Sequence, residues 1–333
     1  MQLASATGRQ RKLGTLAPMN NSYGFGFRAM SSHCEIRLDG DDEHSLAEAA
    51  QRAIDEVQRI ELKYSRYRDD SIVSRINAAA GSDERVEVDA ETASLLDFAG
   101  SLHSLSDGLF DITSGVLRRA WDFRAGRVPD PAELKALLPL IGWSQVEWSQ
   151  ATGPERRIRL PRAGMELDFG GFGKEYAADR AMAILAAAGQ RHGFVNLGGD
   201  IRVLGTRADG SAWRFGIQHP RQAEGTIASV DMSEGALASS GDYERYFELD
   251  GRRYCHILDP RTGWPVSSWA SISVTAPACV AAGALSTIAM LKGEQALAFL
   301  ATQCATYLAV DTSLRTFHHR LPEGGRFVSG ADQ

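Results

Sequence analysis

A predicted hairpin with reactive side chains at both ends places the strongest constraint on this chain of 333 residues. Tyr246–Leu249 and Arg253–Ile257 each alternate apolar and polar positions, and Asp250-Gly251 stands between them. Asp-Gly tolerates the positive φ angles of a two-residue turn, so the stretch predicts a β-hairpin. Ser239–Asp242 leads into it, and His256–Gly263 leads out with a His, an Asp and an Arg. Such residues also serve ordinary turns, so the hairpin alone leaves a structural turn and a binding site both open.

A second stretch, Asp168–Tyr176, places three glycines between a predicted strand and a predicted helix. Glycines at a helix N-terminus let backbone N–H groups approach a phosphate closely, and the helix dipole adds to this attraction. The spacing matches neither a dinucleotide-binding motif nor a P-loop, because Lys174 is followed by Glu175 rather than by Ser or Thr. A structural turn and a phosphate loop are both consistent with this pattern.

The remaining patterns alternate between helix and strand. Ser45 and Glu48 fit a capping box that opens a helix running to Tyr64. Asp89 is predicted to cap a second helix, and Asp130, followed by a proline, to open a short third one. The strands that we expect are 34–38, 146–148, 157–160, 165–169 and 271–275, and a further helix follows Pro277.

Composition excludes several classes of protein. The net charge is −6 and the pI is about 5.8, so nothing in the charge indicates a nucleic-acid partner. No apolar run approaches the ~18 residues of a membrane span. The first 27 residues contain no apolar segment typical of a signal peptide or lipoprotein anchor, and we therefore expect a cytoplasmic protein. The four cysteines are far apart, which favours free thiols over a zinc site.

Five stretches, in the same order, resemble the FAD:protein FMN transferases, the ApbE family. The similarity covers about residues 29 to 310. The stretches are Gly108–Thr113 (Gly-x-Phe-Asp-x-Thr), Asp168–Tyr176, Asn196–Asp200 (Asn-x-Gly-Gly-Asp), the pair Ser240–Tyr243 and His256–Gly263 around the hairpin, and Gly283–Thr287.

The resemblance implies an α+β fold: an ApbE-like, T-fold-like mixed α/β unit with largely antiparallel sheets around an FAD cleft. We expect three regions, namely a flexible extension at 1–27, the transferase domain at 28–318 and a tail at 319–333. The implied reaction transfers FMN from FAD to a Ser or Thr hydroxyl of a target flavoprotein as a phosphoester, with release of AMP and dependence on Mg²⁺. FAD and that flavoprotein are the implied partners.

The resemblance also carries roles to particular residues. His256 is the candidate base, because an imidazole suits proton abstraction near neutral pH, and Lys174 would stabilise charge on the leaving phosphate. Asp259 completes the catalytic set. A His on a half-buried strand, bonded to Asp259, is the alternative for His256. The residues implied in binding FAD are Met30, Tyr67, Leu109, Phe110, Asp111, Asp168, Gly171, Lys174, Ser240, Gly241, His256, Ile257, Arg261 and Thr262.

The implied metal site departs from the family pattern. The family holds Mg²⁺ with an Asp and a Thr four residues apart on one helical face. Thr287 is present here, but Gly283 stands at the Asp position, and the carbonyl of Gly173 is the third implied ligand. Gly173 and Glu175 depart as well, since they stand where the family pattern has Ala and Gly. A glycine inside a helix costs roughly 1 kcal/mol relative to Ala, so local propensity does not explain Gly283. We expect a weakened metal site, Glu175 as a substitute carboxylate, and tighter metal binding in a Gly283→Asp variant.

Three functions remain open from the sequence. The first is an active flavin transferase. The second is a non-catalytic or weakly FAD-hydrolysing FAD-binding protein of the same fold, which the missing Asp favours. The third is an interaction protein that binds no flavin.

Overall fold

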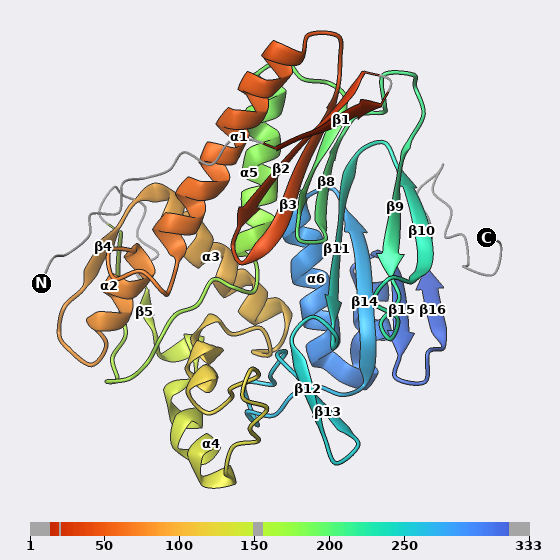
Figure 1. The fold of residues 1–333 in the computed structure, drawn as a ribbon. Coiled ribbons are helices and arrows are strands. Elements are labelled where there is room, and N and C mark those ends of the chain that lie inside the picture. The colour runs from red at the N-terminus through yellow and green to blue at the C-terminus, as the bar shows by residue number, and fades with distance from the viewer. Residues whose placement is uncertain (1–13, 20, 149–155, 320–333) are drawn as a thin grey trace, which may run out of the picture.

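A nine-stranded sheet forms the middle of the molecule in the computed structural model, which describes residues 14–19, 21–148 and 156–319 (Figure 1). Every pairing in this sheet is antiparallel. In spatial order the strands are β1 (Gly14–Met19), β2 (Ser22–Ala29), β3 (Ser32–Asp39), β7 (Gly193–Leu197), β8 (Asp200–Leu204), β11 (Gly235–Gly241), β14 (Trp269–Ala276), β15 (Thr306–Asp311) and β16 (Thr316–His319).

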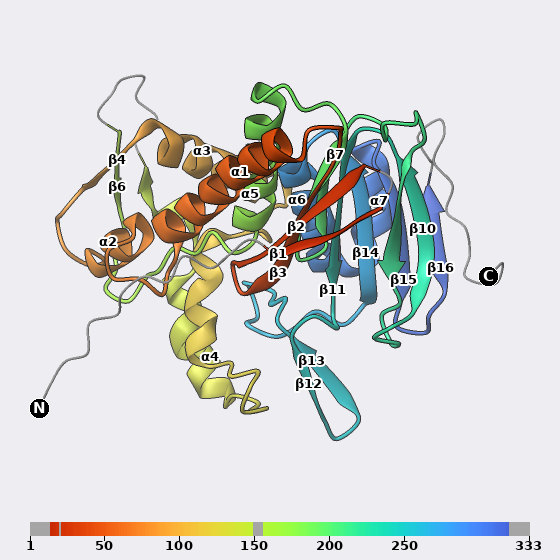
Figure 2. The same cartoon turned by 45° about the horizontal axis from the view of Figure 1, so that its top comes forward.

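Three long helices cover one face of the sheet: α1 (Glu43–Tyr64), α5 (Gly173–Ala187) and α6 (Cys279–Lys292). Helix α5 lies between α1 and α6, as Figure 2 shows. Their apolar sides form the main core with β3, β7, β11 and β14. The other helices are α2 (Ile72–Ala78), α3 (Ala90–Leu105), α4 (Pro131–Leu137), α7 (Ala296–Thr302) and four short 3₁₀ helices, η1 (Ile112–Arg119), η2 (Leu138–Leu140), η3 (Trp143–Gln145) and η4 (Gly293–Gln295).

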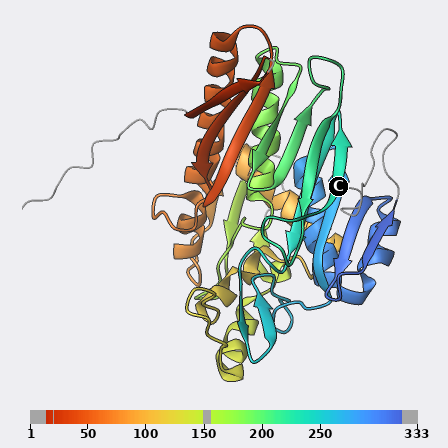
Figure 3. The same cartoon turned by 45° about the vertical axis from the view of Figure 1, so that its right-hand side comes forward.

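The opposite face of the sheet is covered by two further strands, β9 (Trp213–Gln218) and β10 (Thr226–Met232), which Figure 3 shows in front of the sheet. β9 alternates buried and exposed residues, as expected for a strand with one face in a core. Its Trp213 and Phe215 pack edge-to-face on Phe194 of β7, with ring centroids 5.1 Å apart in each pair. The part of the large sheet formed by β7, β8, β11 and β15 is therefore buried on this face as well.

The predicted hairpin projects from the lower end of the molecule as β12 (Tyr246–Leu249) and β13 (Arg252–Cys255). Asp250 and Gly251 have φ angles of 52° and 73°, as a two-residue primed turn requires. Phe247 and Tyr254 on the hairpin pack against Trp121. A third small sheet contains β4 (Val86–Val88), β6 (Arg156–Arg159) and β5 (Glu147–Trp148), in that order.

The N-terminal prediction is wrong for part of its range. Residues 14–19 and 22–29, expected to be flexible up to residue 27, form β1 and β2 at the edge of the large sheet. In β2, Tyr23, Phe25 and Phe27 alternate with glycines, and glycines weaken a strand pattern. Residues 1–13 lie outside the described residues, as does the predicted tail apart from His319, which ends β16.

Two local predictions are corrected and others are confirmed. Asp42, rather than Ser45, caps α1, because its side chain accepts from the amides of His44 and Ser45. Residues 165–169 are not a strand: the Leu167 amide donates to the side chain of Asn77, and that of Asp168 to the carbonyl of Ile112. The caps at Asp89 and Asp130 are confirmed. In the described ranges, no helix is both long and apolar enough to cross a bilayer.

Candidate functional site

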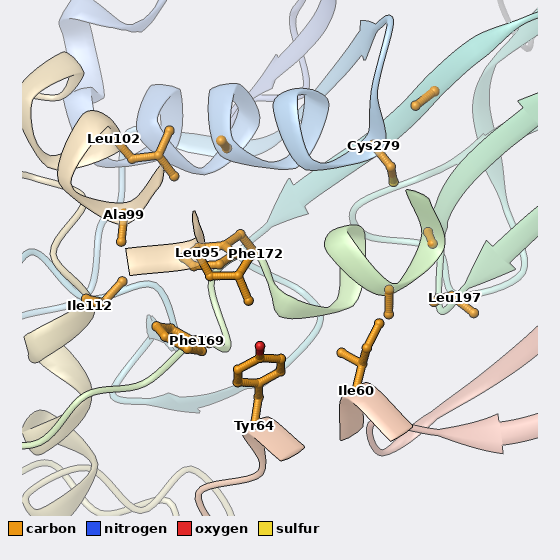
Figure 4. Packing of buried hydrophobic residues seen from close by; sticks show 14 of the residues in the cluster. Ile60, Tyr64, Leu95, Ala99, Leu102, Ile112, Phe169, Phe172, Leu197 and Cys279 are labelled. Carbon is orange, nitrogen blue, oxygen red and sulfur yellow. The ribbon is translucent and has the colours of Figure 1, made fainter. Parts of the chain in front are cut away.

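A cluster of aromatic rings holds the glycine-rich loop against the helical layer. Phe169 and Phe172, on either side of Gly170-Gly171, have ring centroids 5.4 Å apart, and Phe169 also packs on Tyr64 of α1. Figure 4 shows these three rings gathered beside the N-terminal end of α5. The backbone of Gly171 comes so close to Phe110 that a Cβ there would lie 2.8 Å from the ring. The loop therefore has a fixed position and requires glycine at 171.

Lys174, which is half-buried, forms an ion pair with a buried carboxylate at the start of α5. Its Nζ lies 2.5 Å from Oδ2 of Asp200, the first residue of β8, whose side chain is 4 % exposed. Burial opposes the charge of Lys174, but the carboxylates of Asp200 and Glu175 more than offset this and raise its pKa above the ordinary range. Lys174 is therefore a fixed cation at the end of a phosphate-loop-like turn.

Glu175 is buried next to Lys174 and has no complete set of partners. Among the described residues, its Oε2 has no hydrogen-bond partner. Burial raises the pKa of Glu175 to about 8, and the charge of Asp200 acts in the same direction. Its side chain lies against Gly283 of α6: a Cβ at Gly283 would be 2.5 Å from Oε1 and 2.6 Å from Cγ. Glu175 thus occupies the space where a side chain at 283 would begin.

Hydroxyl groups line the adjoining turn of α6. The Ser240 hydroxyl, on β11, lies 2.9 Å from the Thr287 hydroxyl and 2.8 Å from that of Ser286. Ser286 in turn donates to the carbonyl of Gly283. Thr287, Gly283, Glu175 and Ser240 thus belong to one neighbourhood, where β11 and the N-terminal part of α5 meet α6.

Gly173, the third expected metal ligand, begins α5 directly before Lys174. A Cβ at Gly173 would meet only the Cβ of Phe169, at 3.8 Å, which is ordinary contact. The position therefore accepts the Ala that the family pattern has there. The departure at 173 is sterically neutral, whereas the departures at 175 and 283 are coupled by direct contact.

His256 follows β13 and has a buried ring nitrogen, Nδ1, without a partner among the described residues. Burial and the nearby charge of Arg245 lower the pKa of His256 to about 4, and the charge of Lys174 contributes in the same direction. The imidazole is therefore neutral at pH 7. The alternative of a His256–Asp259 bond finds no support, because Asp259 pairs instead with Arg261 at 2.9 Å and accepts from its amide.

The other expected flavin-binding residues fall into two groups. Tyr67 belongs with the glycine loop: Arg66 pairs with Asp168 and also donates to the Tyr67 hydroxyl. Tyr67 is 76 % exposed, and the guanidinium of Arg66 lies over its ring at 5.0 Å from the centroid, so much of the residue remains accessible to a ligand. Asp168 accepts from the amide of Gly170. Leu109 and Phe110 are buried, and the Phe110 ring lies against Gly171.

Asp111 differs from this group because its carboxylate is satisfied inside the protein. It accepts from the amide and hydroxyl of Thr113 and from the amide of Trp143. A role of Asp111 toward a ligand through its side chain therefore requires that these bonds change, and its evident role is to shape η1.

The remaining expected residues lie around these groups. Met30 is in the β2–β3 turn with φ 50°, and its amide donates to Glu61. Gly241 ends β11, where a Cβ would meet the Tyr243 ring at 2.4 Å. Ile257 is buried, and Arg261 and Thr262 are exposed in the turn after the hairpin. No bond joins Arg261 or Thr262 to the glycine loop among the described residues.

Sequence reasoning missed three contributors. The sequence marks Asp200 only as part of a Gly-Gly-Asp turn, although it is the partner of Lys174. Ser286 is not singled out by any motif. Arg66 belongs to the run around Tyr67 whose arginines could meet a phosphate, but its bonds to Tyr67 and Asp168 were not expected. Asp200 had a signal, since an Asp in a Gly-Gly-Asp turn opening a buried strand needs a cation. Ser286 had none, because Ser240, the residue through which it reaches the site, is distant in sequence.

Comparisons with known proteins decide the family. A profile described as the ApbE family matches residues 30–309. The chain belongs to the ApbE family. A curated ApbE-type relative from Treponema pallidum, named FAD:protein FMN transferase, is 34 % identical over 79 % of this chain and 76 % of its own length. The expected family is confirmed, and the expected enzyme class agrees with the curated name.

Solved ApbE structures have the same fold. The ApbE protein from Thermotoga maritima has a TM-score of 0.82 and 31 % identity, and the match covers 90 % of this chain and 97 % of that one. The flavin transferase ApbE from Vibrio cholerae has a TM-score of 0.76 and 26 % identity, over 90 % and 96 % of the two chains. The expected mixed α/β fold with antiparallel sheets is thus confirmed.

The oxygen atoms at the α5–α6 contact fit a magnesium ion. Mg²⁺ prefers oxygen ligands, keeps several waters and often needs only one or two carboxylates when phosphates are also bound. No cluster of three or more His, Cys, Asp or Glu with metal-binding geometry occurs in the described part of the chain. Thr287 and the unpartnered Oε2 of Glu175 provide a smaller set of oxygens, which suits a metal shared with a phosphate-bearing substrate.

Proposed function

We propose that this chain transfers FMN from FAD to a Ser or Thr hydroxyl of a target flavoprotein. The acceptor oxygen forms a bond to the FMN-side phosphorus of FAD, and the bond from that phosphorus to the bridging oxygen breaks. AMP leaves with the bridging oxygen, and the acceptor proton passes to a base. The single observation that supports this best is the ion pair of Lys174 with the buried Asp200 at the glycine-rich start of α5, in a chain of the ApbE family.

The glycine loop and Lys174 suit the pyrophosphate of FAD. The N-terminus of α5 presents the positive end of a helix dipole, although the amide of Gly173 already donates to the carbonyl of Phe169. Lys174 adds a full positive charge, and Asp200 holds that charge in place at 2.5 Å. Charge that develops on the departing AMP phosphate is stabilised by donors that are already oriented. The exposed Tyr67 offers an aromatic surface for the flavin end, and the buried Phe110 supports the glycine loop at Gly171.

His256 is the proposed base. Its neutral imidazole has an unpartnered Nδ1, which is the state that can accept the acceptor's proton. The low pKa makes the free enzyme's imidazole a weak base, and the negative charge of bound FAD would raise it. Asp259, which stabilises the turn after His256, is then a positioning residue rather than a direct partner.

We include magnesium in this proposal, held by Thr287, the carbonyl of Gly173 and a carboxylate. When bound, the ion would neutralise phosphate charge as a Lewis acid. Hydrogen bonds would keep the Thr287 oxygen in position for the ion. The Thr287 hydroxyl bonds to that of Ser240, and the Ser240 hydroxyl bonds to that of Ser286.

The second candidate function is FAD binding with weak hydrolysis or none. Gly283 favours it, because the family's carboxylate is absent at that position. The two functions differ in one product. A transferase leaves flavin covalently on a protein, whereas a hydrolase releases free FMN and AMP.

The experiment that separates them works with an unidentified acceptor. The purified chain is incubated with FAD, Mg²⁺ and a protein extract of the source organism, and the proteins are separated on a denaturing gel. We expect a flavin-fluorescent band that is absent without the chain, and a mass spectrum that places FMN on a Ser or Thr. Release of FMN and AMP without any labelled protein would support the hydrolytic alternative and overturn the transferase.

A further inference from the structure

The glycine at position 283 is explained by side-chain packing and not by helix propensity. It lies inside α6, where a glycine costs roughly 1 kcal/mol relative to Ala, so something must offset that cost. Glu175 explains why no larger residue stands here. The three atoms nearest to a Cβ built at Gly283 are Oε1, Cγ and Cδ of Glu175, all within 2.8 Å. Any side chain at 283 would collide with Glu175 in its present place.

We propose that the metal-site carboxylate of this chain has moved from α6 to α5, so that Glu175 serves toward a divalent cation in place of the side chain missing at Gly283. This inference rests on the proposed function and deepens its metal site. The two departures from the family pattern, Glu175 for Gly and Gly283 for Asp, are then one exchange. The carboxylate enters the same space from the facing helix.

Two observations support a ligand role over mere filling of space. Glu175 is 8 % exposed, yet its Oε2 has no hydrogen-bond partner among the described residues. A buried carboxylate without partners is unfavourable unless something binds it. The second observation is position: Gly283 and Thr287 are one helical turn apart, so a carboxylate against Gly283 lies on the helix face that presents the Thr287 hydroxyl.

The geometry also revises the expectation for Gly283→Asp. From the sequence, that single change is expected to strengthen metal binding. With Glu175 in place, however, the new side chain would collide with Glu175. The carboxylate can return to α6 only when Glu175 is removed at the same time. The informative variant is therefore the double exchange Glu175→Gly with Gly283→Asp.

The test uses Mn²⁺ as the probe, with binding followed by electron paramagnetic resonance at saturating FAD, and with FAD alone as the blank. Wild type should bind one Mn²⁺, and Glu175→Gln should weaken that binding about tenfold or more. Glu175→Gly should weaken it similarly, and the double exchange should restore it. Thermal melting without metal gives a second readout: Gly283→Asp should lower Tm by several degrees, and the double exchange should recover most of that loss.

The matched control is Asp39→Asn. Asp39 on β3 is also a buried carboxylate with one unpartnered oxygen, Oδ1, while its other oxygen pairs with Arg207. Its loss should leave Mn²⁺ binding unchanged.

Wild-type Mn²⁺ affinity in Glu175→Gln would overturn the proposal, as would wild-type chain that binds no Mn²⁺ with FAD present. A double exchange that melts normally yet binds no Mn²⁺ would also contradict it. Failure of the proposed function would give a different result. If the chain binds Mn²⁺ through Glu175 but labels no acceptor protein, this inference stands and the proposed transferase activity is wrong.

Discussion

Two glutamates in the first turns of two helices have opposite surroundings. Glu91 of α3 lies 2.6 Å from Arg59, 2.5 Å from Lys63 and 2.8 Å from the Tyr176 hydroxyl. Glu175 of α5, next to Tyr176, has an oxygen with no hydrogen-bond partner in the described part of the chain and lies against Gly283. The first carboxylate has its partners inside the protein, and we propose that the second serves a ligand.

The pKa values follow the same division. Burial opposes ionisation of Glu91, but hydrogen bonds from Arg59, Lys63 and Tyr176 more than offset it and lower its pKa to about 2. Burial raises the pKa of Glu175 to about 8. A carboxylate that stabilises a fold is ionised and paired, whereas one that serves a site can be tolerated at a cost to stability.

The largest expected effect on stability comes from Lys174→Met. It leaves the carboxylate of Asp200, 4 % exposed, without its cation, and removal of one member of a buried pair costs about 3 kcal/mol or more. Lys63→Met should cost only about 1 kcal/mol, because Glu91 keeps Arg59 and Asp89 is half-exposed. Urea unfolding measures both. Equal losses would mean that the two ion pairs do not differ as the comparison requires.

His256→Asn extends the comparison to catalysis, since the buried Nδ1 of His256 also has no hydrogen-bond partner among the residues that the structure describes. Transfer of FMN should fall about 100-fold, because a general base contributes on that scale. FAD affinity, measured by calorimetry, should remain within about twofold. A variant with the wild-type transfer rate would reduce His256 to a structural residue.

Gly283→Ala tests whether Glu175 of α5 fills the space beside Gly283 of α6. In the wild-type background the new Cβ meets Glu175 at 2.5 Å, and we expect a loss of about 1–2 kcal/mol from overpacking. In a Glu175→Gly background the same change should stabilise by up to about 1 kcal/mol, the helix propensity of Ala over Gly. Chemical unfolding of the four proteins gives the cycle. The same sign in both backgrounds would show that Glu175 does not hold the space.

Glu91→Gln has the smallest effect and a defined pH dependence. The folded pKa of Glu91 is lowered to about 2 from an ordinary value of 4.5, so its ionised form stabilises the fold above about pH 4.5. That contribution, about 1 kcal/mol after allowance for partial exposure, is lost as the pH falls toward 2. The stability difference between wild type and variant should therefore shrink from pH 6 to pH 3. A difference that is constant with pH would contradict the assignment.

Much of the fold was readable from local sequence. Asp250-Gly251 predicts the hairpin turn because few other pairs accept two positive φ angles, and Asp89 predicts a cap because its side chain reaches the amide of Thr92. β2 was missed because glycines between its aromatic residues hide the strand pattern. Residues 165–169 were wrongly predicted to form a strand. Two of their amides donate to Asn77 and Ile112, and no local sequence pattern shows these bonds.

The site divides in the same way. Lys174 and His256 stand in motifs that can be read along the chain. The contact of Glu175 with Gly283 joins two helices far apart in sequence, so each departure looks unexplained until the helices are packed. The sequence identifies Glu175 as a candidate metal ligand, but it does not show that Glu175 fills the space at Gly283.

The most direct measurement of the central claim is the rate of FMN transfer to a labelled acceptor as a function of Mg²⁺ concentration, for wild type, Glu175→Gln and Glu91→Gln. If Glu175 is the carboxylate left for the cation, Glu175→Gln should need about tenfold more Mg²⁺ for half-maximal rate. Glu91→Gln should match wild type, because its carboxylate serves only the fold. Identical Mg²⁺ dependence in wild type and Glu175→Gln would contradict the account.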